Sequence, residues 1–162
     1  MLSLALVGAD ALDARLDAWP AALRAVLAQK VALLAAALAD KVRTEKLSGG
    51  ILNARTGALR ESILAEAGAE GEMILARIGV VGEVKYAAIQ EYGGKTAAHE
   101  IVPTKAAALA FVAGGALRFA RRVEHPGSRI PERSYLRSSL SEMADDIVAA
   151  LAAAPVEAWE RS

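Results

Sequence analysis

One apolar stripe near the start of the chain constrains its fold more than any other feature. Apolar residues recur there at spacings of three and four, at Leu12, Leu16, Trp19, Leu23, Val26, Leu27, Leu34, Leu38 and Val42. This spacing places them on one side of a long helix. We expect Asp10 to cap its start and Ser48-Gly49-Gly50 to end it. Pro20 removes one backbone hydrogen bond inside the helix, so we expect a kink or a split there.

The rest of the chain alternates strand and helix signals. Residues 63–67 and 72–80 alternate around the four-residue loop 68–71, which predicts a β-hairpin. Further expected elements are strands at residues 1–7, 99–103, 107–113 and 117–123, a short helix over 84–92, and a last helix that opens at Ser134 and ends or kinks at Pro155. The sequence therefore predicts an α+β fold, with a long N-terminal helix and a C-terminal helix packed on a small, mainly antiparallel β-sheet. We expect one domain over residues 1–162.

Composition narrows the class of protein. The 162 residues include 19 Lys and Arg, 19 Asp and Glu, and no cysteine. A neutral chain lacks the global positive charge of a general nucleic-acid or anionic-membrane binder, and without cysteine there are no disulfides, thiolate nucleophiles or Cys-ligated zinc. The longest strongly apolar stretch is residues 31–39, whereas a membrane span needs about 20 residues. We expect no membrane segment and no targeting leader.

Residues with catalytic potential occur in no recognised catalytic arrangement. His99 and His125 lie outside any metal-ligand spacing, and the glycine pairs belong to neither GxxxxGK nor GxGxxG. Paired acids such as Asp145 and Asp146 are better explained as a solvated face than as an acid and base pair. We expect no enzyme, no bound metal and no cofactor.

Arginine is concentrated in one segment of this neutral chain. Residues 118–137 contain two acids and six arginines. The arginines are Arg118, Arg121, Arg122, Arg129, Arg133 and Arg137. Three interpretations stay open: a solvated strand and loop, a docking face for a partner or another subunit, or a surface beside DNA in a channel. In the second, the acids Glu142, Asp145 and Asp146 of a neighbour would balance the arginines.

Local structure alone gives expected roles for residues of two short segments, 56–57 and 86–92. Thr56 is expected to cap a short helix that runs through Ile63, and Gly57 to allow close approach of the backbone. Tyr86 is expected in the core, because an aromatic side chain on a short helix usually packs inward. Glu91 and Tyr92 are either core and cap residues or interface anchors.

Three blocks of sequence, in order, resemble a known family. Residues 47–63 contain LSG, then LNARTGALRESI; residues 86–94 read YAAIQEYGG; residues 131–140 read PERSYLRSSL. These are similar to signatures of the small tail-completion proteins of long-tailed phages, prophages and gene transfer agents. In the third block the family usually has P-x-R-P-F-L-R-P-A-L, and this chain has serines at the later proline positions and Tyr135 for Phe. The family-motif positions are Arg55, Thr56, Gly57, Leu59, Tyr86, Glu91, Tyr92, Gly93, Tyr135 and Leu136.

The resemblance implies a structural protein of the virion, at the head–tail junction. Such proteins act as tail-completion or tail-terminator subunits, and they form a ring, typically of six copies, that caps the tail tube. The implied partners are other copies of the chain, the major tail tube protein, and head-completion or adaptor proteins. Assembly would take place in the host cytoplasm. DNA would pass nearby without specific binding; the alternative is an adaptor whose segment Arg118–Arg137 faces the DNA.

Overall fold

A computed structural model describes residues 8–53 and 56–162 of the chain. The chain divides into two compact units, one of Met1–Lys85 with Ser134–Ser162 and the other of Tyr86–Arg133. The structure confirms the α+β class, with a long N-terminal helix, C-terminal helices and antiparallel strands. The expectation of a single domain stays a prediction. The strand expected over residues 1–7 lies outside the described residues.

The first unit is built on one long helix, α1 (Ala9–Lys41). The helix starts after Gly8, and Asp10 lies in its first turn without a capping hydrogen bond, so the expected Asp10 cap is wrong. Pro20 lies inside α1 and does not split it. The helix continues into a π-helical segment, η1 (Val42–Gly50), whose backbone leaves helical geometry at Ser48 and Gly49, where the sequence predicted the end.

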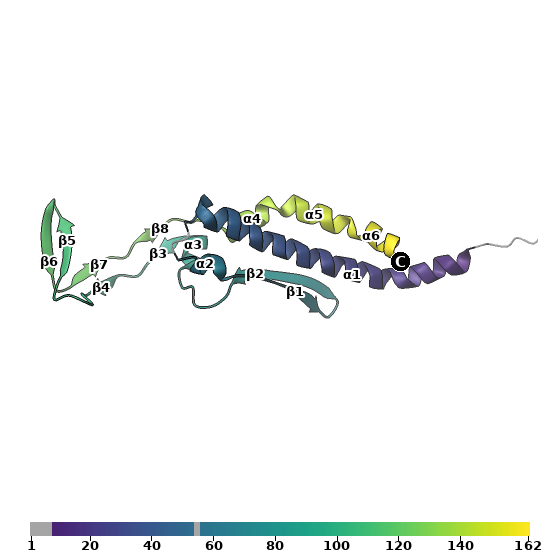
Figure 1. The fold of residues 1–162 in the computed structure, drawn as a ribbon, viewed down its shortest axis with the longest axis horizontal. Helices are drawn as coiled ribbons and strands as arrows, with labels where there is room; N and C mark the ends of the chain where they lie inside the picture. The colour runs from purple at the N-terminus through teal and green to yellow at the C-terminus, as the bar shows by residue number, and fades with distance from the viewer. Residues whose placement is uncertain (1–7, 54–55) are drawn as a thin grey trace, which may run out of the picture. The chain divides into compact units, whose positions relative to one another are not determined.

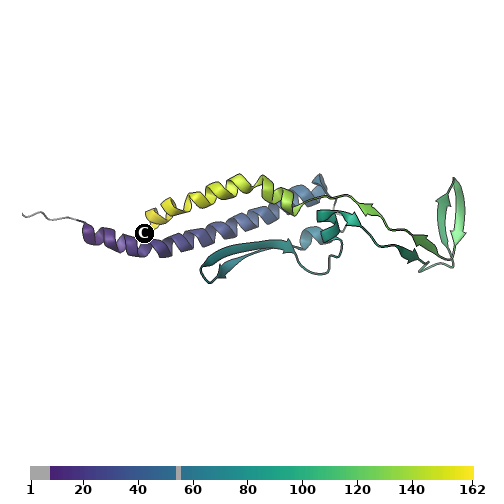
Figure 2. The same cartoon turned by 180° about the vertical axis from the view of Figure 1, so that it is seen from behind.

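Helix α1 is the middle layer of this unit. On one side lie α4 (Leu136–Glu142), α5 (Ala144–Ala152) and α6 (Ala154–Arg161), and on the other lies the hairpin of β1 (Ile63–Glu70) and β2 (Met73–Val80) (Figure 1). The opposite view shows the same arrangement (Figure 2). A short helix, α2 (Ala58–Glu61), leads into the hairpin. Charged residues of α1 interact with both neighbouring layers. Arg24 donates a hydrogen bond of 2.5 Å to the carbonyl of Gly71 in the hairpin turn, and Lys30 forms a 2.7 Å ion pair with Glu157 of α6.

Small residues form the contact between α1 and the C-terminal helices. Val26 is buried with Ala154 and Ala158 of α6, and the side chains of Trp19, Leu23 and other partly buried residues surround them. Alanine at these positions lets two helices approach closely, because the separation of helix axes depends on the side chains between them. The alanine-rich composition therefore has a packing role in this unit.

Several boundaries of the first unit differ from the sequence prediction. The short helix expected to run through Ile63 ends at Glu61, and Ile63 begins β1. The hairpin connection is Gly71-Glu72 instead of four residues, because residues 68–70 continue the ladder opposite 73–75. The expected single C-terminal helix is three short helices, with breaks at Met143 and Ala153. Pro155 lies in the first turn of α6, where its missing N–H has no helical partner to lose, so it starts a helix instead of ending one.

The second unit is a short helix followed by paired strands. Helix α3 (Ala87–Tyr92) starts three residues later than the expected helix over 84–92, and it ends before Gly93, as predicted. The strands pair as β3 (Gly94–Lys95) with β8 (Arg129–Ile130), β4 (His99–Ile101) with β7 (Val123–His125), and β5 (Leu109–Ala113) with β6 (Ala116–Ala120). All three pairs are antiparallel. The expected strand over 117–123 is thus two strands, β6 and β7, and the sequence predicts no strand where the short β8 lies.

The helical stretch Ala9–Gly50 is long and apolar enough to cross a membrane, by length and composition alone. Alanine makes the stretch apolar without a long run of large side chains, which is why the count of strongly apolar residues did not reveal it. A mostly buried core helix of a water-soluble protein and a signal sequence near the N-terminus meet the same criterion. Helix α1 packs against the hairpin and the C-terminal helices, and 17% of its most apolar window is buried. The expectation of no membrane segment stays a prediction.

Candidate assembly interface

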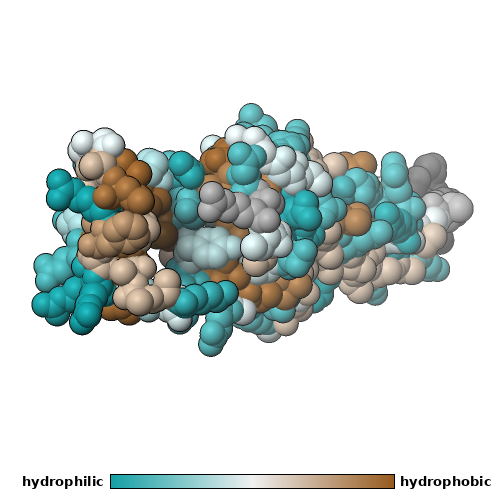
Figure 3. All heavy atoms as spheres, turned by 60° about the vertical axis from the view of Figure 1, so that its left-hand side comes forward, coloured by the Kyte–Doolittle hydropathy of each residue, from teal (hydrophilic) through white to brown (hydrophobic). Residues whose placement is uncertain are grey.

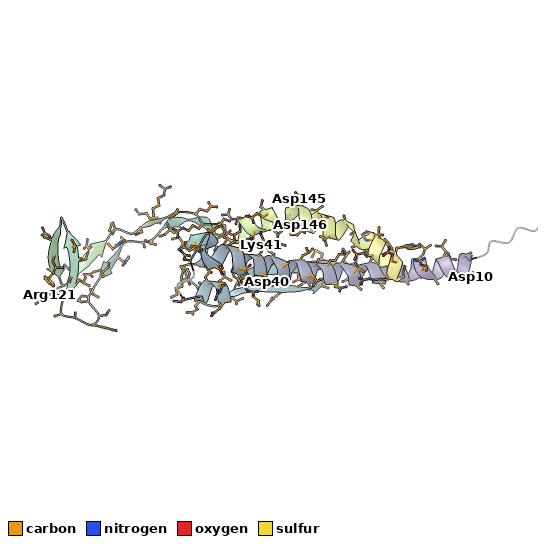
Figure 4. The ribbon with its side chains drawn as sticks, turned by 45° about the horizontal axis from the view of Figure 1, so that its top comes forward. Asp10, Asp40, Lys41, Arg121, Asp145 and Asp146 are labelled. Atoms are coloured by element: carbon orange, nitrogen blue, oxygen red, sulfur yellow. The ribbon has the colours of Figure 1, made fainter. Side chains whose placement is uncertain are left out.

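Most of the arginines singled out in the sequence lie on the second unit. Arg118 is on β6 opposite Phe111 of β5, Arg121 and Arg122 follow β6, and Arg129 is on β8. All four side chains are exposed, and Figure 4 shows Arg121 beside the β5–β6 hairpin. The hairpin turn Gly114-Gly115 has positive φ at both residues, which suits the twist of a two-residue hairpin loop.

These arginines are hardly neutralised within the chain. Arg122 lies 3.6 Å from Glu100, and both side chains are largely exposed, so this pair contributes little. Within the described part of the chain, Arg118 and Arg121 make no ion pair. Their charge is therefore available to an external partner.

The remaining two arginines of the segment, Arg133 and Arg137, lie in different units. Arg133 ends the second unit, where its backbone N–H donates to the carbonyl of Gln90 at 2.8 Å. Arg137 lies on α4 of the first unit and is exposed. The segment 118–137 therefore supplies five arginines to one unit and one to the other.

The three acids proposed to balance the arginines differ from one another. The Glu142 carboxylate lies 2.5 Å from the Lys46 Nζ and 3.1 Å from the Lys41 Nζ. Hydrogen bonds from Lys46 and then Lys41 lower the pKa of Glu142, and hydrogen bonds to Glu45 and then Glu142 raise the pKa of Lys41. Glu142 thus already has cationic partners in its own chain.

Asp145 and Asp146 lie in the first turn of α5 and are exposed (Figure 4). Acidic side chains at this place interact favourably with the positive end of the helix dipole. Neither makes an ion pair among the residues that the structure describes. Of the three acids, these two keep their charge available.

Charge is unequal between the two units although the chain is neutral. Residues 86–133 contain seven Lys and Arg against four Asp and Glu, which gives a net charge of +3. The remaining residues contain twelve against fifteen, which gives −3. One copy of the chain therefore has a basic unit and an acidic unit whose net charges are equal and opposite.

The first block of family-like residues surrounds α2. Arg55 lies outside the described residues. The predicted Thr56 cap is wrong by one residue: Gly57 precedes the helix, with φ of 78°, and the Thr56 Oγ1 accepts a 3.4 Å hydrogen bond from the N–H of Ala58. A Cβ on Gly57 would meet only the flexible side chains of Glu61 and Arg60, so the positive φ is the reason for glycine here. Leu59 is buried.

The second block surrounds α3. Tyr86 is 45% exposed and Tyr92 is exposed as well, so the expectation that Tyr86 belongs to the core is wrong. The buried positions of α3 are Ala87 and Glu91, four residues apart on one face. The Glu91 side chain is 3% exposed and has polar interactions in the structure. Gly93 has φ of 69°, and a Cβ there would lie 2.8 Å from the backbone nitrogen of Glu132.

The third block begins the C-terminal helices. Tyr135 is among the largest fully buried side chains, and its carbonyl accepts a hydrogen bond from the Ser139 hydroxyl at 2.7 Å. Leu136, the first residue of α4, is half-buried. Ser134 lies just before α4, and its hydroxyl accepts the N–H of Ser138 at 3.2 Å. The tyrosine and the serines of this block therefore have local structural roles.

The two histidines are brought together by strand pairing. His99 and His125 are opposite each other in the β4–β7 ladder, and their rings stack with centroids 5.0 Å apart. The sequence separation of these residues gave no sign of this contact. Within the described residues, no group of three or more His, Cys, Asp and Glu is arranged to hold a metal ion. A depression of about 500 Å³ in this unit is lined by Tyr92, Gly93, Gly94, Lys95, Arg129, Ile130, Pro131 and Glu132.

No known protein family, curated protein or solved structure matches the chain. What the site can do therefore rests on its own geometry. Its exposed arginines and the opposite net charges of the two units are features of protein association.

Proposed function

We propose that this protein is a structural virion component of the head–tail junction, a tail-completion or tail-terminator subunit that forms a ring on the tail tube. The observation that carries the proposal is the division of a neutral chain into a basic unit and an acidic unit. A ring needs a heterologous interface, in which two different and complementary surfaces of each copy meet. Opposite net charges on the two units supply that complementarity.

The resemblance of three sequence blocks to tail-completion proteins supports the choice of this assembly. The residues of these blocks lie at α2, α3 and the start of α4. The proposed partners are other copies of the chain, the tail tube protein and the head-completion proteins. The proposed role needs no catalytic group, metal or cofactor.

Light scattering of the purified protein, alone and with its candidate tail tube protein, tests the proposal. We expect a species of ring size, either alone or with the tube protein, and electron microscopy of that species should show closed rings. A mass of one chain in both conditions would contradict the proposal.

The second candidate function is an adaptor that contacts DNA through the second unit. The observation in its favour is the net charge of +3 on residues 86–133, with Arg118, Arg121 and Arg129 exposed. Binding of this kind weakens steeply with salt, with a log–log slope of roughly −0.9 for each phosphate contacted. Fluorescence anisotropy with labelled duplex DNA at several salt concentrations separates the two functions, because ring assembly by protein contacts does not depend on DNA.

A further inference from the structure

One face of the β5–β6 hairpin is apolar and uncovered. Residues paired across the two strands share a face, so Ala110 with Phe119 and Val112 with Leu117 form one side of the hairpin. The side chains of Val112, Leu117 and Phe119 are 62–71% exposed. Figure 3 shows brown and tan atoms gathered on this part of the molecule, with hydrophilic atoms at its edge. An isolated two-stranded hairpin is marginally stable in water, so such a face needs a partner.

A second apolar surface, at the start of α1, is left uncovered by the residues that the structure describes. The apolar stripe of this helix packs against α6 from Trp19 onward, and the Arg15 guanidinium lies over the Trp159 ring at 4.2 Å. Leu12 and Leu16 continue the stripe toward the N-terminus and are about half exposed, at 49% and 51%. In Figures 1 and 2, α1 extends past the end of α6.

The two surfaces are flanked by opposite charges. Arg121 and Arg122 directly follow the strand that carries Leu117 and Phe119, whereas Arg118 pairs with Phe111 on the opposite face of the hairpin. Asp10, Asp13 and Asp17 adjoin the exposed leucines of α1, and none of the three makes an ion pair among the residues described. The helix dipole accounts for Asp10 in the first turn, but its effect fades within one turn and does not account for Asp13 and Asp17.

The spacings of the two apolar surfaces also agree. Leu117 and Phe119 are two residues apart on a strand, which separates them by about 6.8 Å. Leu12 and Leu16 are four residues apart on a helix, which separates them by about 6 Å along its axis. The two pairs of side chains therefore have comparable spacings.

We propose that the β5–β6 hairpin of one copy of this chain docks on the start of α1 of a neighbouring copy, with Val112, Leu117 and Phe119 against Leu12 and Leu16. Arg121 and Arg122 then face Asp13 and Asp17 of that neighbour. The contact is heterologous, because each copy gives its hairpin to one neighbour and its helix to another. The inference rests on the proposed ring function and names the contact that builds the ring.

Site-directed crosslinking tests this contact, and the absence of native cysteine makes it specific. Leu16→Cys and Phe119→Cys are made as separate variants at exposed positions, mixed in equal amounts, and treated with a short thiol-reactive crosslinker. Circular dichroism checks that each variant is folded. The matched control replaces Leu16→Cys by Val148→Cys, an exposed apolar position on α5.

We expect a crosslinked pair of the two variants under assembling conditions, and none with the Val148→Cys control. An assembled ring without this specific crosslink overturns the docking contact and leaves the proposed function standing. A specific crosslink in a species that never closes into a ring, alone or with the tube protein, contradicts the proposed function and keeps the contact. A chain that stays a monomer in every condition overturns both.

A charge exchange tests the polar part of the contact. Arg121→Glu with Arg122→Glu places like charges opposite Asp13 and Asp17, so we expect association to weaken by about tenfold or more. Adding Asp13→Lys and Asp17→Lys to the same chain restores opposite charges at every interface and should restore association. No rescue by the second pair overturns the assignment of α1. Crosslinking within one chain of the Leu16→Cys, Phe119→Cys double variant at high dilution overturns the assignment to a neighbouring copy.

Discussion

Gly57 and Gly93 both adjoin short helices and both have positive φ, yet they differ in what surrounds them. A Cβ on Gly57 would meet the flexible Glu61 side chain, whereas a Cβ on Gly93 would meet the backbone of Glu132. Gly93 also combines φ of 69° with ψ of −178°, a region that is essentially restricted to glycine. The connection after α3 therefore depends on glycine at this position.

We predict that Gly93→Ala destabilises the protein by about 1–3 kcal/mol, from backbone strain and displacement of the Glu132 backbone. Urea unfolding followed by circular dichroism measures the change. The control is Gly68→Ala on β1, where a Cβ meets no heavy atom within 4 Å. If the two variants unfold at the same urea concentration as the natural chain, the close approach at Gly93 is not a constraint.

Glu142 is predicted to stabilise the fold in a way that depends on pH. Its lysine partners lower its pKa below the ordinary value of 4.5 in the folded chain. A carboxyl whose pKa is lowered by folding stabilises the native state above its unfolded pKa, and this contribution is lost as the pH falls through the folded value.

We therefore expect Glu142→Gln to lower the melting temperature at pH 7, and the difference from the natural chain to close as the pH falls below about 4.5. Differential scanning calorimetry at both pH values measures it. Glu83→Gln is the control, since the exposed Glu83 makes no ion pair in the described part of the chain. A difference that stays constant from pH 7 to pH 3 would show that the lysine pairing is not its cause.

At the scale of elements, the closest packing is between α1 and α6. Ala154 and Ala158 are fully buried against Val26. A larger side chain there must displace its neighbours, because Val26, Ala154 and Ala158 are all fully buried against one another. Helix α6 also presents the exposed Val156, which gives a comparison on the same element.

We predict that Ala158→Leu destabilises the first unit by about 1–3 kcal/mol through overpacking. Val156→Ala should change stability by no more than about 0.5 kcal/mol. Thermal unfolding of both variants, followed by the helical circular dichroism signal, measures the difference. Equal melting temperatures for the two variants would mean that the α1–α6 contact can accommodate a larger side chain without loss of stability.

Element boundaries show where local sequence stops being informative. The long helix, the hairpin and α3 followed by Gly93 were predictable, because periodicity and glycine act over a few residues. The breaks of the C-terminal helix at Met143 and Ala153 were not, because its apolar positions continue at helical spacing through the first break. Pro155 was identified as important, but its place at a helix start depends on the break before it.

At the scale of the whole molecule, the opposite net charges of the two units matter more for the proposed assembly than the neutral charge of the whole chain. Arg122 is 74% exposed at the side chain, and its pairing with Glu100 at 3.6 Å is weak. Its replacement should therefore cost little stability and remove attraction to an acidic neighbour.

We predict that Arg122→Glu weakens assembly and leaves the monomer folded. Light scattering measures assembly, and circular dichroism with thermal unfolding measures the fold. Arg60→Glu, an equal change of charge at an exposed position of the first unit, should leave assembly unchanged. An unfolded Arg122→Glu monomer, or assembly equal to that of the natural chain, would contradict the prediction.

The candidate interface was predictable only in part. The arginine cluster was visible as a local charge excess, because charge is a property of composition. The exposed apolar face of β5–β6 was not, since alternation marks a strand without saying which of its faces stays uncovered. Glu142 could not be separated from Asp145 and Asp146, because its partners Lys41 and Lys46 are distant in sequence.

The sequence by itself determined the α+β class, the long first helix and its end at Ser48 and Gly49, the β1–β2 hairpin and the arginine excess. These features follow from side-chain periodicity, glycine conformation and charge, which act within a few residues. Only the tertiary structure decided that Tyr86 is exposed while Glu91 is buried, that His99 stacks on His125, and that the hairpin face and the start of α1 stay uncovered. Such facts depend on which distant segments pack together, and no local pattern contains that information.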